Sequence, residues 1–120
     1  MMKKVLFAIL AVFILIQFIR PEKNNSKNET NAMSTVMEIP FEVTKIIQTS
    51  CADCHSNSTK YPWYSEIAPA SWFLAQHVNE GKEHLNFSEW TTYNKDQKEH
   101  IIKDLKEVLN EREMPLKSYL

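Results

Sequence analysis

CADCH at residues 51–55 opens the stretch CADCHSNSTKYPWYSEIAPASWFLAQHVNEG, which runs to Gly81. Its two cysteines, Cys51 and Cys54, are the only cysteines in the 120-residue chain. Residues three apart on one helical turn face the same way, so both sulfurs can form thioether bonds to one edge of a porphyrin. His55 then lies beneath the iron, and the pattern CxxCH is typical of covalent haem c attachment. We therefore expect one haem c per chain, held by these three residues.

Three other interpretations of the cysteine pair stay open. A thioredoxin-like redox pair would need a βαβ context, which the sequence does not offer. A structural zinc site would need further ligands from His77, His84 and His100, and the third possibility is a surface disulfide. Each of these would make the chain a thiol or zinc-binding interaction module instead of a haem protein.

A hydrophobic leader precedes the motif. Residues 1–20, MMKKVLFAILAVFILIQFIR, carry two lysines and then an apolar run that only Gln17 interrupts, which is the pattern of a secretory signal. No small-x-small cleavage site and no lipobox cysteine follow, so we expect an uncleaved signal anchor. It would hold the rest of the chain on the periplasmic or outer side of the cell membrane. The alternative is a cleaved signal peptide that releases a periplasmic or secreted protein.

The remainder divides into two parts. Residues 21–38 are polar and have no periodic apolar positions, which predicts a flexible linker. Residues 39–120 are the expected folded domain. A domain of roughly 80 residues buries only a small apolar core, and a covalent cofactor would add the stability that such a core does not provide.

Acidic residues dominate the chain after the leader. The net charge of the whole chain is −1, but Lys3, Lys4 and Arg20 belong to the leader and all 15 acidic residues follow it. Binding to nucleic acid needs clustered Lys and Arg, and no basic patch is present. The partners that we expect are redox proteins and the membrane, not nucleic acid.

The composition predicts an all-α fold, because the chain has one glycine, five prolines and few alternating β-branched residues. Apolar spacing predicts a first helix over about residues 41–50, which delivers the chain to Cys51. A second helix should begin near Pro69 and end with Gly81 as its C-terminal cap. His77 then falls on the apolar face of this helix.

A third helix should follow Asn94, which with Gln97 has the pattern of a capping box. This helix should end by about Arg112, because Pro115 cannot continue the hydrogen-bond ladder. Met114 is then placed on an extended loop. The inward-facing stripe of the helix consists of Ile101, Ile102, Leu105, Val108 and Leu109.

The sixth ligand of the iron can come from four side chains: Met114, His77, His84 and His100. His84 and His100 lie among charged residues, so we expect both to be solvated. Met114 is the only methionine after the linker and precedes a proline, so we favour a thioether ligand, with His77 as the alternative. Methionine–histidine ligation raises the reduction potential relative to ligation by two histidines.

Aromatic residues cluster between the motif and the second helix. Flat rings can pack against a porphyrin edge, and an indole NH or phenol OH can bind a propionate. We therefore expect Tyr61, Trp63, Tyr64 and Trp72 to contact the haem. The alternative is ordinary packing in a helical core.

Three segments together resemble a known family. They are CADCHS at residues 51–56, TKYPWYSEIAPASWFLAQHVNEGKEHLNFSEW at residues 59–90 and EMPLKSYL at residues 113–120. In these segments the chain is similar to the small haem-binding domain family of bacterial membrane and periplasmic proteins, which is related in kind to the c-type cytochromes. The resemblance covers about residues 41–120.

The resemblance implies a compact helical haem domain, like a small c-type cytochrome, behind the N-terminal anchor. Cys51, Cys54 and His55 match the attachment motif of the family, and Met114 matches its EMP element, a candidate for the distal ligand. Members of the family often continue past the SYL element with a further helix, whereas this sequence stops at Leu120. We therefore expect a more exposed haem edge, which favours electron exchange and lowers the potential somewhat.

No residues form a protein-based catalytic set, because neither a nucleophile–base–orienter arrangement nor a recognisable pair of carboxylates is present. We expect no enzyme activity and interpret the chain as a one-electron carrier. The alternative function is a haem-based sensor or small-ligand binder, in which a weak bond from Met114 yields to a diatomic gas.

Overall fold

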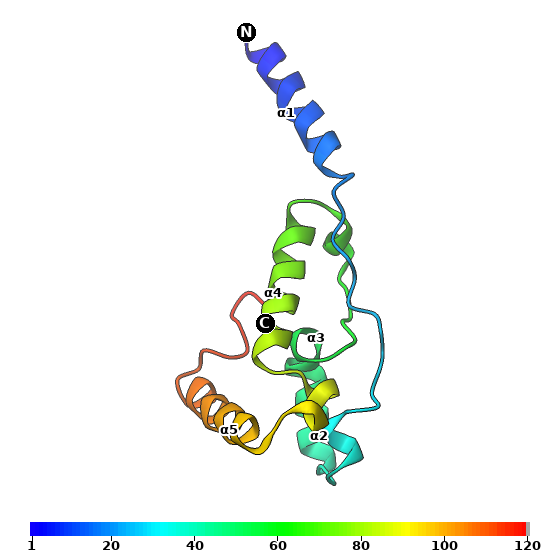
Figure 1. Ribbon diagram of the computed structural model, residues 1–120. Coiled ribbons are helices and arrows are strands. Elements are labelled where there is room, and N and C mark those ends of the chain that lie inside the picture. Colours follow the sequence, from blue (N-terminus) through cyan, green and yellow to red (C-terminus); the bar gives the residue numbers. More distant parts are fainter. Residues whose placement is uncertain (120) are drawn as a thin grey trace.

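The computed structural model describes residues 1–119, and these residues form helices without any strand. This confirms the all-α prediction. Five α-helices follow one another within residues 1–119, and α1 extends away from a body that the other four make (Figure 1). Their bounds are Met2–Ile16 for α1, Phe41–Ser50 for α2, Ala52–His55 for α3, Ala70–His84 for α4 and Lys95–Asn110 for α5. Three 3-10 helices lie between them: η1 at Met33–Thr35, η2 at Trp63–Glu66 and η3 at Phe87–Thr92.

Helix α2 has the bounds that the apolar spacing predicts, and it stops at the first cysteine. Cys51 leaves the helical conformation with φ −128° and ψ −41°, and the single turn of α3 begins immediately after it. The carbonyl oxygen of Cys51 accepts hydrogen bonds from the backbone NH groups of Cys54 and His55, at 3.2 and 3.0 Å. The motif therefore forms its own helical turn, which sets both cysteines and the histidine in fixed positions.

Helix α4 packs against α3, and the contact runs through the only glycine of the chain. The prediction of Gly81 as a C-terminal cap is wrong, because α4 continues to His84. A Cβ atom at position 81 would lie 2.5 Å from the carbonyl oxygen of Cys54 and 3.1 Å from its Cβ. Gly81 thus allows the backbones of two helices to approach more closely than any side chain would permit.

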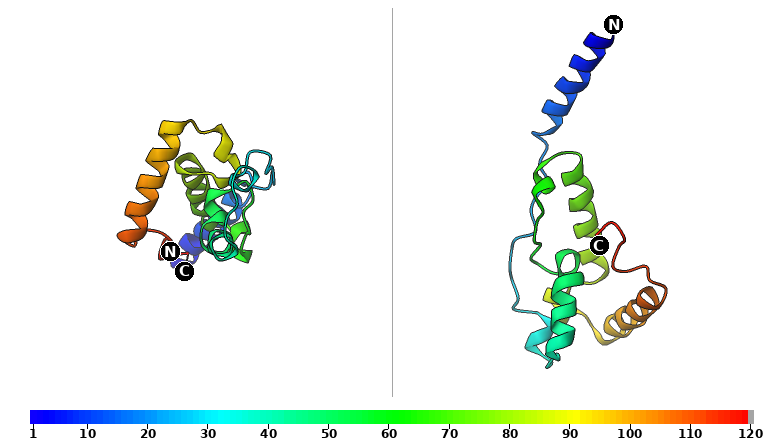
Figure 2. Two further views of the ribbon diagram at one scale, coloured as in Figure 1. Left: turned by 90° about the horizontal axis from the view of Figure 1, so that it is seen from below. Right: turned by 180° about the vertical axis from the view of Figure 1, so that it is seen from behind.

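Helix α5 begins at the predicted capping box. The side chain of Asn94 accepts from the backbone NH of Gln97, and the side chain of Gln97 accepts from the backbone NH of Asn94, both at 2.9 Å. The helix ends at Asn110, and Arg112 then takes the left-handed conformation with φ 59°. From there the chain turns back toward α3 and α4, and α5 itself stands apart from those helices (Figure 2).

The polar segment 21–38, expected as a flexible linker, lies along the body of the domain (Figure 1). Asn24 is its main point of attachment: its Nδ2 donates to the carbonyl oxygen of Ser56 at 2.7 Å and to Oγ1 of Thr59 at 2.9 Å. Its Oδ1 accepts from Nζ of Lys82 at 2.7 Å. The difference from the expectation arises because asparagine side chains bond to backbone groups of a loop, which apolar periodicity does not report.

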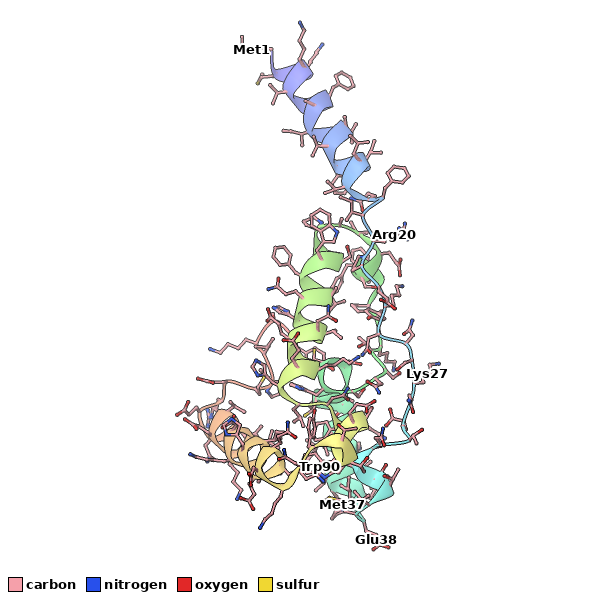
Figure 3. The ribbon with its side chains drawn as sticks, in the orientation of Figure 1. Met1, Arg20, Lys27, Met37, Glu38 and Trp90 are labelled. Carbon is pink, nitrogen blue, oxygen red and sulfur yellow. The ribbon has the colours of Figure 1, made fainter. Side chains whose placement is uncertain are left out.

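Helix α1 carries the leader sequence and has no buried residue. Within residues 1–119, no helix combines the length and the apolar character needed to cross a membrane. Figure 3 shows Arg20 at the junction between α1 and the body, and Trp90 at the opposite end of the body, close to the start of α5.

The close contact at Gly81 predicts that Gly81→Ala lowers the free energy of unfolding, whereas the same substitution usually raises it in a helix. At an ordinary exposed helix position, Gly→Ala stabilises a protein by about 1 kcal/mol. Here we expect Gly81→Ala to destabilise by about 1–3 kcal/mol, because the added methyl group overlaps the backbone of Cys54. Urea unfolding followed by circular dichroism measures the change. Asn79→Ala, at an exposed position on the same helix, is the matched control and should change stability by less than about 0.5 kcal/mol. A Gly81→Ala chain as stable as this control would contradict the close contact.

Candidate cofactor site

A cavity of about 720 Å³ opens between the α2–α3 turn, the C-terminal half of α4, α5 and the chain that follows α5. Its volume falls in the range of roughly 300–1,000 Å³ that is typical of small-molecule and cofactor sites. One wall is apolar and comes from α5, which contributes Ile101, Leu105, Val108 and Leu109. These are four of the five residues of the predicted inward stripe; the fifth, Ile102, does not line the cavity. Helix α5 therefore turns its apolar face to the cavity.

Cys51, Cys54 and His55 all line this cavity, as the CxxCH pattern predicts. Both cysteines are half-buried free thiols. Burial raises the pKa of both thiols, and the neighbouring Asp53 carboxylate raises the pKa of Cys54 further. Cysteines that act as nucleophiles in thiol–disulfide exchange have a lowered pKa instead.

The ring of His55 is held by a backbone carbonyl. Its Nδ1 lies 2.9 Å from the carbonyl oxygen of Leu85. A carbonyl oxygen can only accept, so Nδ1 carries a proton, and in the neutral imidazole Nε2 then has the free lone pair. Leu85 is buried and directly follows α4, where its own NH donates to the carbonyl of Gly81 at 3.0 Å. This arrangement is typical of a histidine that ligates a metal through Nε2.

The role of Leu85 cannot be predicted from the sequence. Its contribution is a backbone carbonyl, so the identity of its side chain carries no signal for it. Only the close packing of α3 on α4 brings residues 55 and 85 together.

Met114 lines the same cavity as His55, in the chain that follows α5. Its backbone NH lies 3.4 Å from the carbonyl oxygen of Val108, and its side chain is 36 % exposed. Pro115 and Leu116 line the cavity beside it. The structure therefore brings together the attachment motif and the methionine that we favour as sixth ligand, while the ligation itself stays a prediction.

The three remaining histidines also contribute to the lining of the cavity. His77 was expected on the buried face of α4, but it is exposed and Val78 beside it is buried instead. His84 is the last residue of α4 and is exposed. The side chain of His100 is 74 % exposed, and its Nε2 lies 3.1 Å from Oδ2 of Asp104. All three histidines therefore lie on the solvent side of the site.

The aromatic cluster expected at the haem lies elsewhere. None of Tyr61, Trp63, Tyr64 and Trp72 lines the cavity. Trp63 and Tyr64 lie in η2, which packs on α4, and Trp72 lies in the first turn of α4, whereas the cavity lies along the C-terminal half of this helix, which rises about 22 Å over its 15 residues. Tyr61 lies outside the cavity as well, and its hydroxyl group accepts from the backbone NH of Asn24 at 2.7 Å. Trp63 is 80 % exposed, and Nε1 of Trp72 donates to the carbonyl oxygen of Ile19 at 2.8 Å. These contacts do not support the predicted packing against a porphyrin. The aromatic rings at the cavity are those of Phe87, Tyr93 and Tyr119.

Tyr119 ties the C-terminal segment to the attachment motif. Its hydroxyl group donates to Oδ2 of Asp53 at 2.6 Å and lies 3.2 Å from the carbonyl oxygen of Thr49. Burial raises the pKa of Tyr119, and the hydrogen bond to the Asp53 carboxylate raises it further. The segment from Met114 to Tyr119 therefore crosses the cavity and is fixed at both ends. Tyr119 has no local sequence signal for this contact, because only the fold places it next to Asp53.

The residues present fit a covalently attached haem. Two thiols stand on one helical turn, an imidazole offers a free Nε2, and a thioether lines the same cavity, whose volume and apolar α5 wall suit a porphyrin. No curated protein and no solved structure matches the chain. A family model described as a haem-binding domain matches residues 11–120, which include every residue that lines the cavity and the segment 21–38 as well. The chain therefore belongs to the haem-binding domain family.

Proposed function

We propose that this chain binds one haem c through thioether bonds to Cys51 and Cys54 and transfers single electrons. The observation that carries the proposal is the hydrogen bond between Nδ1 of His55 and the carbonyl of Leu85, which leaves Nε2 free beside both thiols. When bound, the haem would supply the one-electron couple. The protein residues attach it, orient its axial ligand and surround it.

Each part of the cavity has a distinct task in this proposal. The Leu85 carbonyl fixes the orientation of the imidazole ring of His55. The apolar wall of α5 keeps water from one face of the site. Met114 supplies the sixth ligand from the other end of the cavity, which raises the reduction potential relative to a second histidine. His77 remains the alternative ligand.

We further propose that α1 is retained and anchors the domain at the outer face of the cytoplasmic membrane. Exposed apolar side chains cover α1 on all sides, as in a helix that is surrounded by lipid. Contacts of Gln17 and Ile19 with the body of the domain support retention, since cleavage before residue 20 would remove them.

A second candidate function is the reversible binding of a small diatomic ligand. The observation in its favour is the position of Met114 in an irregular segment, where the side chain is partly exposed and can move aside. Reactivity of the reduced protein with carbon monoxide distinguishes the two functions. An electron carrier whose sixth ligand is firmly bound reacts slowly with carbon monoxide, whereas a sensor reacts with it readily.

Covalent attachment is tested by replacing the two thiols. The wild-type chain, expressed with a c-type haem maturation system, should give a haem-stained band on a denaturing gel and a reduced pyridine spectrum of haem c. A Cys51→Ser/Cys54→Ser chain should lose the stained band completely, because no other cysteine can form a thioether. Met114→Ala is the matched control and should keep the band. Wild-type protein without covalent haem, under conditions that mature a known cytochrome, would refute the proposal.

The sixth ligand is tested by Met114→Ala. We expect the visible spectrum to change from low-spin to high-spin, and the potential to fall, because a thioether bond is lost. His77→Ala should leave both unchanged. The reverse result, a change with His77→Ala and none with Met114→Ala, would transfer the assignment to His77.

The hydrogen bond of Tyr119 should matter for the sixth ligand. Tyr119→Phe removes a hydroxyl group that stabilises the C-terminal segment by about 1 kcal/mol, so carbon monoxide should bind to the reduced protein about fivefold faster. Tyr64→Phe removes an equivalent hydroxyl group away from the cavity and should have no effect. Equal rates in the wild type and the Tyr119→Phe chain would show that Met114 is held without this bond.

A further inference from the structure

Large apolar side chains are exposed at the end of the domain where α1 joins it. Trp63 is 80 % exposed, Phe18 is 81 % exposed and Phe73 is 63 % exposed. We call this set the apolar collar; it consists of Phe18, Ile19, Trp63, Tyr64, Ile67 and Phe73. It does not belong to the haem site, because none of its members lines the cavity.

The collar comes from two distant parts of the sequence, and hydrogen bonds join these two parts. Oε1 of Gln17 accepts from the backbone NH of Ala68 at 2.9 Å, and Nε2 of Gln17 donates to the carbonyl oxygen of Ala68 at 3.2 Å. Nε1 of Trp72 donates to the carbonyl oxygen of Ile19 at 2.8 Å. These bonds fix the end of α1 against η2 and the first turn of α4, which carry the other exposed side chains.

The charges at this end are paired. Glu66 is the only acidic residue between residues 60 and 79. Its carboxylate accepts from Arg20 at 3.2 Å and forms a hydrogen bond with Lys23. The hydrogen bond from Lys23 holds the pKa of Glu66 below its usual value. Glu22 lines the same cleft as these three residues, so two carboxylates stand with two cations and the charges beside the collar balance.

Helix α1 by itself is short for a bilayer. Its 15 residues rise about 22 Å, whereas the hydrocarbon core of a membrane is about 30 Å thick. The apolar surface continues past the end of α1 through Phe18 and Ile19 to the collar residues of η2 and α4. Tryptophan and tyrosine are the residues that proteins concentrate at the boundary between headgroups and acyl chains.

We propose that the apolar collar sits in the interface of the lipid bilayer that α1 enters. The domain then stands directly on the membrane surface, with the α1 end immersed to the depth of Trp63 and Phe73 and the haem cavity facing away from the lipid. This inference rests on the proposed anchoring by α1. A lipid surface fits better than a second protein, because the collar continues the exposed apolar surface of α1 and carries Trp63 and Tyr64, residue types that proteins concentrate at the lipid interface.

Photo-crosslinking of the full chain tests the proposal. p-Benzoylphenylalanine is introduced at Trp63 or Phe73, and the chain is reconstituted in vesicles of phosphatidylethanolamine and phosphatidylglycerol. Illumination should give lipid adducts, detected by mass spectrometry, with a yield at least about tenfold above that of the control position. The control is Ile102, an apolar residue on α5 that is 38 % exposed at the cavity end. Phe13 on α1, which is 44 % exposed, reports the insertion of the anchor.

The outcomes distinguish a failure of the collar proposal from a failure of anchoring by α1 or of haem attachment. Adducts at Trp63, Phe73 and Phe13, with none at Ile102, support the collar. Adducts at Phe13 alone overturn the collar and keep the anchor, and adducts at none of these positions overturn both. Haem staining of the same samples reports the cofactor separately, so a failure of haem attachment cannot be mistaken for a failure of the membrane contact.

Discussion

The contact between Gly81 of α4 and the backbone of Cys54 is the constraint on which the rest of the site depends. It brings α4 so close to the CxxCH turn that the first residue after the helix, Leu85, can offer its carbonyl oxygen to His55. That hydrogen bond in turn decides which ring nitrogen of His55 is free for a metal. A larger residue at position 81 would separate the two helices and change the tautomer, the ring orientation and the cavity together.

Polar contacts hold much of the folded body together. Only five apolar residues are buried in the described chain, and several serine, threonine and asparagine residues are buried with them. Within residues 1–119 every buried side-chain nitrogen or oxygen atom has a hydrogen-bond partner. Asn57, for example, donates to the carbonyl oxygen of Asn28 and to Glu89, and its own NH donates to Ser88. The apolar face of α5 meets the cavity and not another helix, so the cofactor would be the middle layer of the core.

Much of the fold could be predicted from the sequence, because local patterns determine it. Helix α2 and the capping box of Asn94 and Gln97 depend on short-range spacing, and both are observed. The end of α4 was misjudged, because a glycine that caps a helix and a glycine that allows close packing look alike in one sequence.

The candidate site likewise combines residues that a local pattern predicts with residues that only the fold brings together. The CxxCH turn is a local motif, and its residues do line one cavity together with Met114. Trp63, Tyr64 and Trp72 follow the motif in sequence but lie at the other end of the body, because residues 56–69 lead the chain away from the motif to the start of α4, and α4 then returns toward it (Figure 1). The roles of Leu85 and Tyr119 depend on contacts across 30 and 66 residues, which no spacing rule describes.

Helix α4 connects the two ends of the domain, and under the proposed electron transfer its length has a consequence for the encounter with redox partners. The collar surrounds its first turn, and the cavity begins near His77 and ends at Leu85. The hydrogen bonds of Gln17 with Ala68 and of Trp72 with Ile19 hold the end of α1 against the body. In the proposed membrane-bound arrangement, the length of α4 would hold the haem site at a set distance from the lipid surface. A membrane-embedded partner would then need a part that extends from the lipid to the haem site. A soluble electron carrier could reach the haem site without contacting lipid.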